Sequence, residues 1–179
     1  PETAFNLGSI NKLFTATAIR QLAAAGKVDL DSTLLKYLPD YPNREVARKV
    51  TLRQLLTFRS GIGGDIFGVP ASGRRHDILH NRDYLPLFVN EPLQIEPGTQ
   101  QRYSNAGYVI LGLVVEAVSV EDYYEYVHRH IYEPAGMTHT AAYATDSLPS
   151  SVALGYSARD GTLPRGTAVR PNTAMLPGR

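Results

Sequence analysis

The 179-residue sequence contains no cysteine, so it cannot form a disulfide, a thiolate metal site or a cysteine nucleophile. It also has no excess of either charge, because 18 basic and 17 acidic residues leave a net charge of +1. This balance gives no reason to expect a nucleic-acid or membrane-surface partner. No apolar run is long enough to span a bilayer and no stretch resembles a signal peptide, and the sequence leaves the localisation open.

The length predicts a single domain over residues 1–179, and the 43% of hydrophobic residues is typical of a globular protein. The sequence has no initiator methionine, a helix is expected within ten residues of Pro1, and the last ten residues have the composition of a loop. We therefore expect this domain to be a piece of a larger one.

Three helices are expected in the first third of the chain. Apolar side chains recur at helical spacing from residue 10, and Gly26 supplies a left-handed end to this helix. The members of the apolar stripe are Ile10, Leu13, Phe14, Thr17, Ala18 and Leu22. A short helix is expected at residues 33–38, and the capping-box spacing of Thr51 and Gln54 predicts another through residue 57.

The remainder is expected to alternate between loops and helices. Residues 65–81 have few apolar positions, which indicates a long loop that would form part of a substrate rim. A helix is expected at residues 83–90. The almost wholly apolar run at residues 106–118 predicts a helix that is buried on most of its circumference, followed by a second helix. Short alternating segments at residues 152–161 indicate a β-hairpin.

A serine and a lysine, Ser9 and Lys12, stand three positions apart where the first helix opens. This spacing brings both side chains to one helical face. A lysine that is held neutral can take the serine proton, and the positive end of the helix dipole favours a developing oxyanion. Ser9 is therefore the candidate nucleophile and Lys12 its base. The alternative is a helix-capping serine followed by a solvent-facing lysine.

A second candidate cluster contains Tyr103 and Asn105, between a Pro-Gly turn and the buried helix. Because a lysine ammonium favours the phenolate of a nearby tyrosine, Tyr103 would relay protons between Ser9 and a leaving group. Asn105 would hold Lys12 or a substrate carbonyl. The alternative is a tyrosine at the rim of a cleft and an asparagine that caps the helix.

Two further patterns are expected to have no function. The tripeptide at residues 41–43 also reads Tyr-x-Asn, but no helix is expected after it. His76 and His80 have the spacing of a zinc-binding pair, yet a third ligand and the glutamate of a metalloprotease are missing, so loop histidines are expected.

Four ordered segments resemble those of the serine β-lactamase-like family, which includes class C β-lactamases, penicillin-binding DD-peptidases and related esterases. Residues 5–16 resemble the helix that carries the active serine. Residues 51–61 are similar to the T-L-R-x-L-L-T-x-x-S-G segment, and residues 97–108 to the P-G-x-x-x-x-Y-S-N-x-G-Y segment. Residues 134–140 are similar to the P-L-G-M-x-x-T segment, with alanine in place of the leucine.

The resemblance implies an α/β (α+β) protein with the β-lactamase/transpeptidase-like fold. It implies Ser9 as the acylated nucleophile, Lys12 and Tyr103 as proton-transfer groups, and Asn105 as a substrate-binding and positioning residue. The implied reaction is hydrolysis of an ester, a D-amino-acid peptide or a β-lactam through an acyl-enzyme, with esters and peptides favoured. No metal or organic cofactor is implied.

One motif of the family is missing after Tyr103, since neither K-T-G nor H-x-G follows it. The family's N-terminal strands also have no counterpart, so we expect mainly the helical part of the fold with few strands. Without the strand that supplies a second oxyanion donor, this chain alone is expected to be weakly active or inert, and to self-associate, for example as a homodimer. The alternative function is a non-catalytic relative that binds a ligand or a partner in the same cleft.

Overall fold

The computed structural model describes residues 3–64, 66–67, 78–143 and 148–153, and over these ranges the chain is mainly helical. The elements in order are η1 (Gly8–Asn11), α1 (Lys12–Ala24), α2 (Leu34–Tyr37), α3 (Arg44–Lys49), α4 (Leu52–Leu56), η3 (Asn81–Leu87), α5 (Asn105–Ser119), α6 (Tyr123–Val127) and η4 (His128–Tyr132). Of these, η1 and η3 are 3₁₀ helices and η4 is a π-helical turn. Strand pairing among the described residues is limited to two isolated bridges, Ala4 with Val152 and Thr33 with Thr51.

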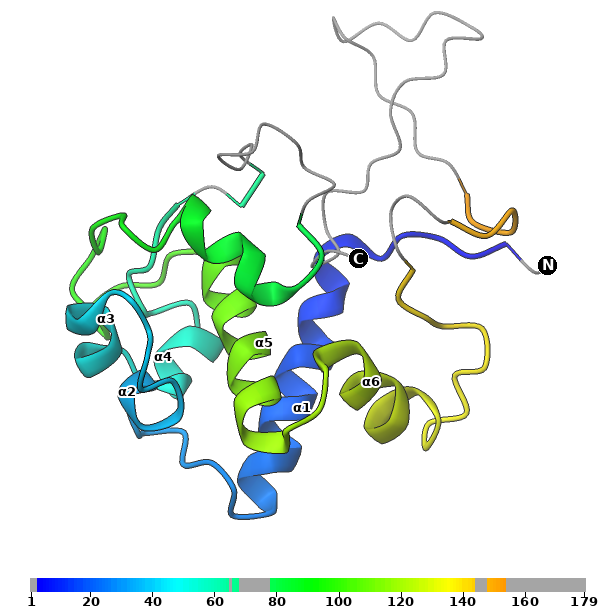
Figure 1. Ribbon diagram of the computed structural model, residues 1–179, viewed down its shortest axis with the longest axis horizontal. Helices are drawn as coiled ribbons and strands as arrows, with labels where there is room; N and C mark the ends of the chain where they lie inside the picture. Colours follow the sequence, from blue (N-terminus) through cyan, green and yellow to red (C-terminus); the bar gives the residue numbers. More distant parts are fainter. Residues whose placement is uncertain (1–2, 65, 68–77, 144–147, 154–179) are drawn as a thin grey trace, which may run out of the picture.

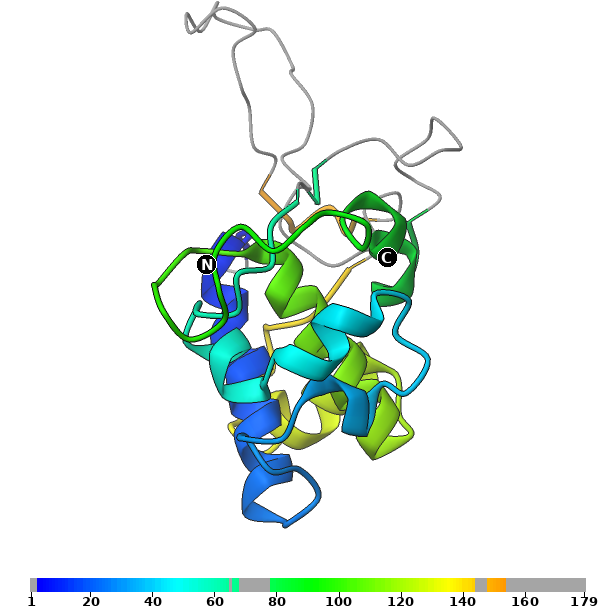
Figure 2. The same ribbon diagram turned by 90° about the vertical axis from the view of Figure 1, so that its left-hand side faces the viewer.

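Two helices, α1 and α5, lie side by side at the centre of the molecule (Figure 1). The short helices α2, α3 and α4 lie on one side of α5, and α6 lies on the other side, against both α1 and α5. In Figure 2, which is turned by 90°, the three short helices lie in front of α5. A search of the described ranges found no helix with the length and apolar character needed to cross a membrane.

The central helix α5 is buried on most of its circumference, which confirms the prediction for residues 106–118. Its buried residues are Ala106, Gly107, Val109, Ile110, Leu111, Gly112, Leu113, Val114 and Val115. Full burial of an aliphatic side chain contributes about 1.5–3 kcal/mol, so this face of α5 holds the surrounding helices together. Ser104 starts the helix, because its side chain accepts from the backbone N–H of Gly107.

The helix α1 differs from its prediction in its start and in its buried face. The α-helix begins at Lys12 rather than at residue 10, after the 3₁₀ turn η1. Ala18 and Leu22 are buried as expected, but Ile10 is 55% exposed and Leu13 is 65% exposed. The stripe was misassigned because polar residues of α1 face α5 near its N-terminus. Exposed apolar side chains therefore lie in η1 and at the start of α1.

The helix α3 was missed, and the prediction that no helix follows residues 41–43 is wrong. Asn43 is the N-cap of α3, and its Oδ1 accepts from the backbone N–H of Val46 at 3.1 Å. Its Nδ2 also donates to the backbone oxygen of Val89 at 3.2 Å. The six-residue helix buries only Val46 and Ala47, so its sequence contains too few apolar residues to show a helical period.

Two later helices differ in form from a regular α-helix. The helix predicted at residues 83–90 is the 3₁₀ helix η3. It contains Pro86, which has no backbone N–H and cannot donate the hydrogen bond of a regular α-helix. The helix after α5 starts at Tyr123, where Asp122 caps it by accepting from two backbone N–H groups. The expected loop at residues 65–81 and the expected hairpin at residues 152–161 fall largely outside the described residues.

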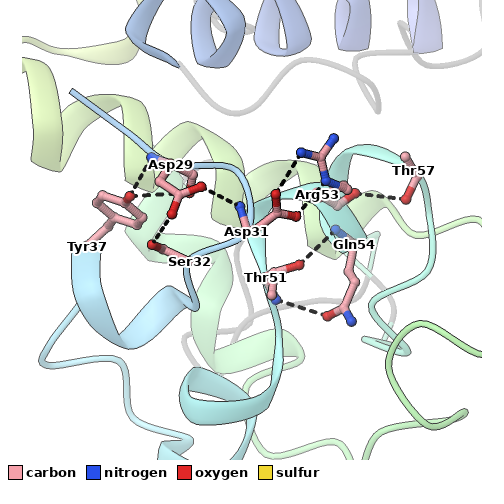
Figure 3. Close-up of polar contacts among 8 residues, drawn as sticks. All are labelled: Asp29, Asp31, Ser32, Tyr37, Thr51, Arg53, Gln54 and Thr57. Atoms are coloured by element: carbon pink, nitrogen blue, oxygen red, sulfur yellow. Dashed lines mark hydrogen bonds and ion pairs between the residues drawn. The ribbon is translucent and has the colours of Figure 1, made fainter. Parts of the chain in front are cut away.

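A polar cluster joins the chain after α1 to the helix α4 (Figure 3). Thr51 and Gln54 form the predicted capping box, and both of its hydrogen bonds are present. Arg53 binds the carboxylate of Asp31 through two nitrogens, at 2.6 and 2.9 Å. Thr57 Oγ1 donates to the backbone oxygen of Arg53 at 2.8 Å. The polar residues of the T-L-R-x-L-L-T segment therefore fix the position of α4.

Candidate active site

Ser9 and Lys12 lie at the N-terminal end of α1, with Ser9 in η1 and Lys12 as the first α-helical residue. Gly8 has a φ of +53°, a left-handed conformation that favours glycine. Its backbone N–H donates to Asn6 Oδ1 at 2.7 Å. Lys12 Nζ lies 3.3 Å from Ser9 Oγ, so the expected contact between the two side chains is present.

Tyr103 and Asn105 reach these two side chains from the segment that enters α5. Tyr103 Oη lies 2.6 Å from Ser9 Oγ, and Lys12 Nζ donates to Asn105 Oδ1 at 2.7 Å. Ser104, between them, is the residue that caps α5. The capping role that the sequence left open for Asn105 therefore belongs to its neighbour, and the Asn105 amide binds Lys12 instead.

Lys12 also borders a small cavity on the inner side of the first helix. Lys12 and Asn105 line a small cavity of about 50 Å³ between α1 and α5, but Ser9 is not among its lining residues and is exposed to solvent. In the first helical turns the cavity is lined by Gly8, Asn11, Lys12 and Thr15, which share one helical face because they are spaced as i, i+3, i+4 and i+7. Ser9 falls one position off this face, so it lies at the exposed rim above Lys12.

The electrostatic environment favours ionisation of Tyr103. Partial burial opposes a negative charge, but hydrogen bonds with Lys12 and Ser9 and the charge of Lys12 outweigh it and hold the pKa of Tyr103 below its ordinary value. Lys12 Nζ also lies 4.9 Å from the centroid of the Tyr103 ring. Because 54% of Tyr103 is exposed, solvent screens part of this effect.

Two more aromatic residues surround Tyr103. The Phe58 ring stacks on it, with centroids 4.9 Å apart and an interplanar angle of 27°, and lies 5.2 Å from the Tyr108 ring. Tyr108 Oη donates to the backbone oxygen of Leu56 at 3.1 Å, and its ring centroid lies 5.7 Å from Lys12 Nζ. Burial raises the pKa of Tyr108, so the pKa values of the two tyrosines beside Lys12 are shifted in opposite directions.

Phe58 is held in a strained backbone conformation. Its φ is +57°, which is rare for a bulky residue and costs of the order of 1–3 kcal/mol. Its backbone N–H donates to Leu55 in α4, and its backbone oxygen accepts from Arg102, the residue before Tyr103, at 2.7 Å. The polar cluster that fixes α4 therefore also fixes Phe58 against the Tyr103 ring.

The sequence-based analysis missed Phe58 and gave no role to Tyr108. Tyr108 closes the P-G-x-x-x-x-Y-S-N-x-G-Y segment, and this position was a signal that could have identified it. Phe58 stands in a loop without periodicity, so no pattern in a single sequence could have found it. His76 lies outside the described residues. Over the described ranges, no group of three or more His, Cys, Asp or Glu side chains is arranged to hold a metal ion.

Comparison with known proteins extends these observations. A family model described as Beta-lactamase matches residues 1–178. The chain is 35% identical over 156 residues to the putative penicillin-binding protein PbpX of Bacillus subtilis (strain 168). This match covers 87% of this chain and 37% of PbpX. It is 30% identical over 164 residues to the protein flp of Staphylococcus aureus (strain N315), covering 90% of this chain and 32% of flp. The chain thus spans about a third of the length of these curated relatives.

Solved structures give the same result. A penicillin-binding protein from Bacillus halodurans has a TM-score of 0.76 and 40% identity, with 90% of this chain and 49% of that chain covered. A D-stereospecific amidohydrolase from Streptomyces sp. has a TM-score of 0.74 and 30% identity, covering 87% and 50%. An octameric penicillin-binding protein homologue from Pyrococcus abyssi has a TM-score of 0.71 and 28% identity, covering 94% and 41%.

These matches agree with the four sequence segments and extend over the helices that carry them. The structural relatives cover nine tenths of this chain or close to it, while the chain covers only about half of each of them or less. The described elements therefore correspond to a mainly helical part of the β-lactamase/transpeptidase-like fold, and this chain belongs to the β-lactamase family.

Proposed function

We propose that this chain carries the nucleophile and proton-transfer groups of a serine hydrolase that acts through an acyl-enzyme. The observation that carries the proposal is the unbroken series of contacts from Asn105 through Lys12 and Ser9 to Tyr103. These four side chains come from two segments that are more than 90 positions apart in the sequence. A solvent-facing lysine and a helix-capping serine would not require such a series.

The distances support a division of roles within this site. Tyr103 Oη lies closer to Ser9 Oγ than Lys12 Nζ does, at 2.6 Å against 3.3 Å. In the proposed acylation step, the Tyr103 phenolate takes the Ser9 proton as Oγ attacks the substrate carbonyl, and the resulting phenol protonates the leaving group. Lys12 stabilises the phenolate, and Asn105 holds the amine of Lys12 in position.

For the substrate we propose an amide or ester of a D-amino acid. The similar structures include a D-stereospecific amidohydrolase, and this similarity supports the proposal. The exposed position of Ser9 suits an extended substrate. A β-lactam is the second substrate class to be tested, because it acylates the same kind of serine.

The test is covalent labelling of the full-length protein with a fluorophosphonate and with a fluorescent penicillin, followed by mass spectrometry. We expect an adduct on Ser9 and none in Ser9→Ala, in which loss of the nucleophile lowers the rate on the order of 10⁴-fold or more. Thr17→Ala is a matched control, because Thr17 is also a hydroxyl residue of this helix and is exposed. If the wild-type protein forms no adduct with either reagent, the chain is a non-catalytic member of the family.

Self-association stays a prediction for this chain. The exposed apolar residues at the start of the molecule, Phe5, Leu7, Ile10 and Leu13, give a surface that favours it. Sedimentation velocity on the purified protein would check it, and a monomer at all concentrations would contradict it.

A further inference from the structure

The small cavity between α1 and α5 has a polar lining that the proposed reaction does not use. Lys12 and Asn105 line it in part, but Asn11 and Thr15 of the first helix segment and Gly112 of α5 line it as well. The described residues Asn81 of η3 and Tyr123 of α6 close it. Five elements, η1, α1, η3, α5 and α6, thus contribute to one cavity beside Lys12.

Two buried polar atoms of this lining have no hydrogen-bond partner among the described residues. They are Asn11 Nδ2, which can only donate, and Asn81 Oδ1, which can only accept. Asn81 is 1% exposed, so its oxygen cannot reach bulk solvent. Buried polar atoms of native proteins are almost always paired, and an ordered water is the usual partner when no protein atom serves.

The neighbours of Asn81 explain why its oxygen is left for the cavity. Its Nδ2 donates to Glu116 Oε1 at 2.9 Å, which fixes the orientation of the amide. A side chain at Gly112 would not leave room for this amide, because a Cβ there would lie 2.8 Å from Asn81 Nδ2. Glu116 and Gly112 are one turn apart on α5, so a single face of this helix holds the amide in place.

We propose that this cavity binds one or more ordered water molecules, which accept a hydrogen bond from Asn11 Nδ2 and donate one to Asn81 Oδ1 beside Lys12. The size fits this ligand, since a water needs about 10–15 Å³ by this measure and the cavity has about 50 Å³. A substrate pocket of about 300–1,000 Å³ would be much larger. Water at this place gives the amine of Lys12 a polar neighbour and limits its movement.

The binding of water is tested on the full-length wild-type protein. A high-resolution crystal structure is expected to show ordered water within about 2.7–3.2 Å of Asn11 Nδ2 and of Asn81 Oδ1, as one shared molecule or as two. In solution, oxygen-17 relaxation dispersion counts long-lived waters, and Asn81→Leu is expected to lose at least one of them. Asn43→Leu is the matched control, because both polar atoms of Asn43 are paired within the protein and it does not line this cavity. We expect it to keep the wild-type number.

A dry cavity, a cavity filled by a protein side chain, or an unchanged number of long-lived waters in Asn81→Leu would overturn the proposal. Asn11→Leu is a second variant that removes the donor instead of the acceptor. If neither variant folds, the measurements on the wild-type protein decide.

The effect of this water on acylation rests on the proposed function, whereas its binding does not. We expect Asn81→Leu to lower kcat roughly tenfold and to leave KM unchanged, because the cavity adjoins Lys12 and not the exposed Ser9. A change in KM alone would refute this positioning role. If the wild-type protein holds the water but forms no acyl-enzyme, the proposed function fails and the water site stands.

Discussion

Two pairs of hydroxyl groups in this protein have the same oxygen–oxygen distance, but the pKa values of their tyrosines are shifted in opposite directions. Ser9 Oγ lies 2.6 Å from Tyr103 Oη, and Thr15 Oγ1 lies 2.6 Å from Tyr123 Oη. The first pair lies at the exposed rim beside Lys12, which helps to hold the pKa of Tyr103 below its ordinary value. The second pair is buried, and burial raises the pKa of Tyr123.

The comparison shows that a short contact between a hydroxyl and a phenol does not make a catalytic pair. Burial raises the pKa of Tyr123 and keeps it protonated, so its contact with Thr15 serves stability. In the proposed reaction, the exposed position of Tyr103 and the neighbouring ammonium of Lys12 allow Tyr103 to exchange a proton with Ser9. The following experiments change one of these conditions at a time.

The largest effect is expected for Lys12→Met, which removes the ammonium and keeps most of the side-chain volume. Acylation should fall on the order of 10³-fold, the scale for loss of a proton-transfer or charge-stabilising group. Lys36→Met is the matched control, because Lys36 Nζ also binds a serine, at 3.2 Å, and lies 5.5 Å from the Tyr37 ring centroid. Rates of adduct formation would be compared by mass spectrometry. Equal rates in Lys12→Met and wild type would make the lysine dispensable.

Tyr103→Phe is expected to lower acylation by about a hundredfold, because it removes the group closest to the Ser9 hydroxyl and leaves the ring in place. The ring should still stack on Phe58, so the fold of the site is retained. An unchanged acylation rate would exclude Tyr103 from the mechanism and leave Lys12 as the sole base.

The ionisation of Tyr103 can also be followed directly. Phenolate absorbance of the wild-type protein minus that of Tyr103→Phe reports this residue alone, and it should appear at a lower pH than for an ordinary tyrosine. Because the folded-state pKa is depressed, the group adds stability above its unfolded pKa and loses this contribution as the pH falls through the folded pKa. In Lys12→Met the titration should move to higher pH. If Tyr103 titrates at the ordinary pKa of tyrosine in both the wild type and Lys12→Met, the proposed electrostatic difference between the Ser9–Tyr103 and Thr15–Tyr123 pairs is wrong.

Phe58→Leu should lower acylation by about tenfold, since it removes the ring that stacks on Tyr103 without touching the reacting groups. Phe58→Gly separates the two roles of this residue. Glycine relieves the strain of the left-handed backbone at φ +57°, so this variant should lose activity while keeping more stability than Phe58→Leu. Thermal unfolding and acylation rates measured on both variants would check this, and full activity of Phe58→Gly would show that the ring is not needed.

Much of this arrangement could be predicted from the sequence, for reasons that differ between residues. The contact of Ser9 with Lys12 follows from helical spacing, and the burial of α5 follows from its apolar run. The contacts of Tyr103 and Asn105 were implied by resemblance alone, because no local pattern joins residues more than 90 positions apart. The exposed face of α1 was misjudged, since a stripe of apolar residues does not reveal that a polar cavity lies on the inner side. No sequence pattern could identify Asn81, because its position depends on contacts with Gly112 and Glu116, which are far from it in the sequence.

The smallest effect on acylation is expected for Tyr123→Phe, which tests the buried pair. The variant leaves Thr15 Oγ1 without its partner at a buried position, and this should lower the free energy of unfolding by about 1–2 kcal/mol. Acylation should fall by less than in Asn81→Leu, because neither hydroxyl contacts Ser9, although both residues line the cavity beside Lys12. The double variant Thr15→Val with Tyr123→Phe should regain part of the lost stability, since removing both partners leaves no unpaired hydroxyl. Denaturant unfolding of the wild type, of the single variants Tyr123→Phe and Thr15→Val, and of the double variant measures this coupling. A hundredfold loss of acylation in Tyr123→Phe would mean that the buried pair acts in the reaction, and the contrast between the two pairs would be wrong.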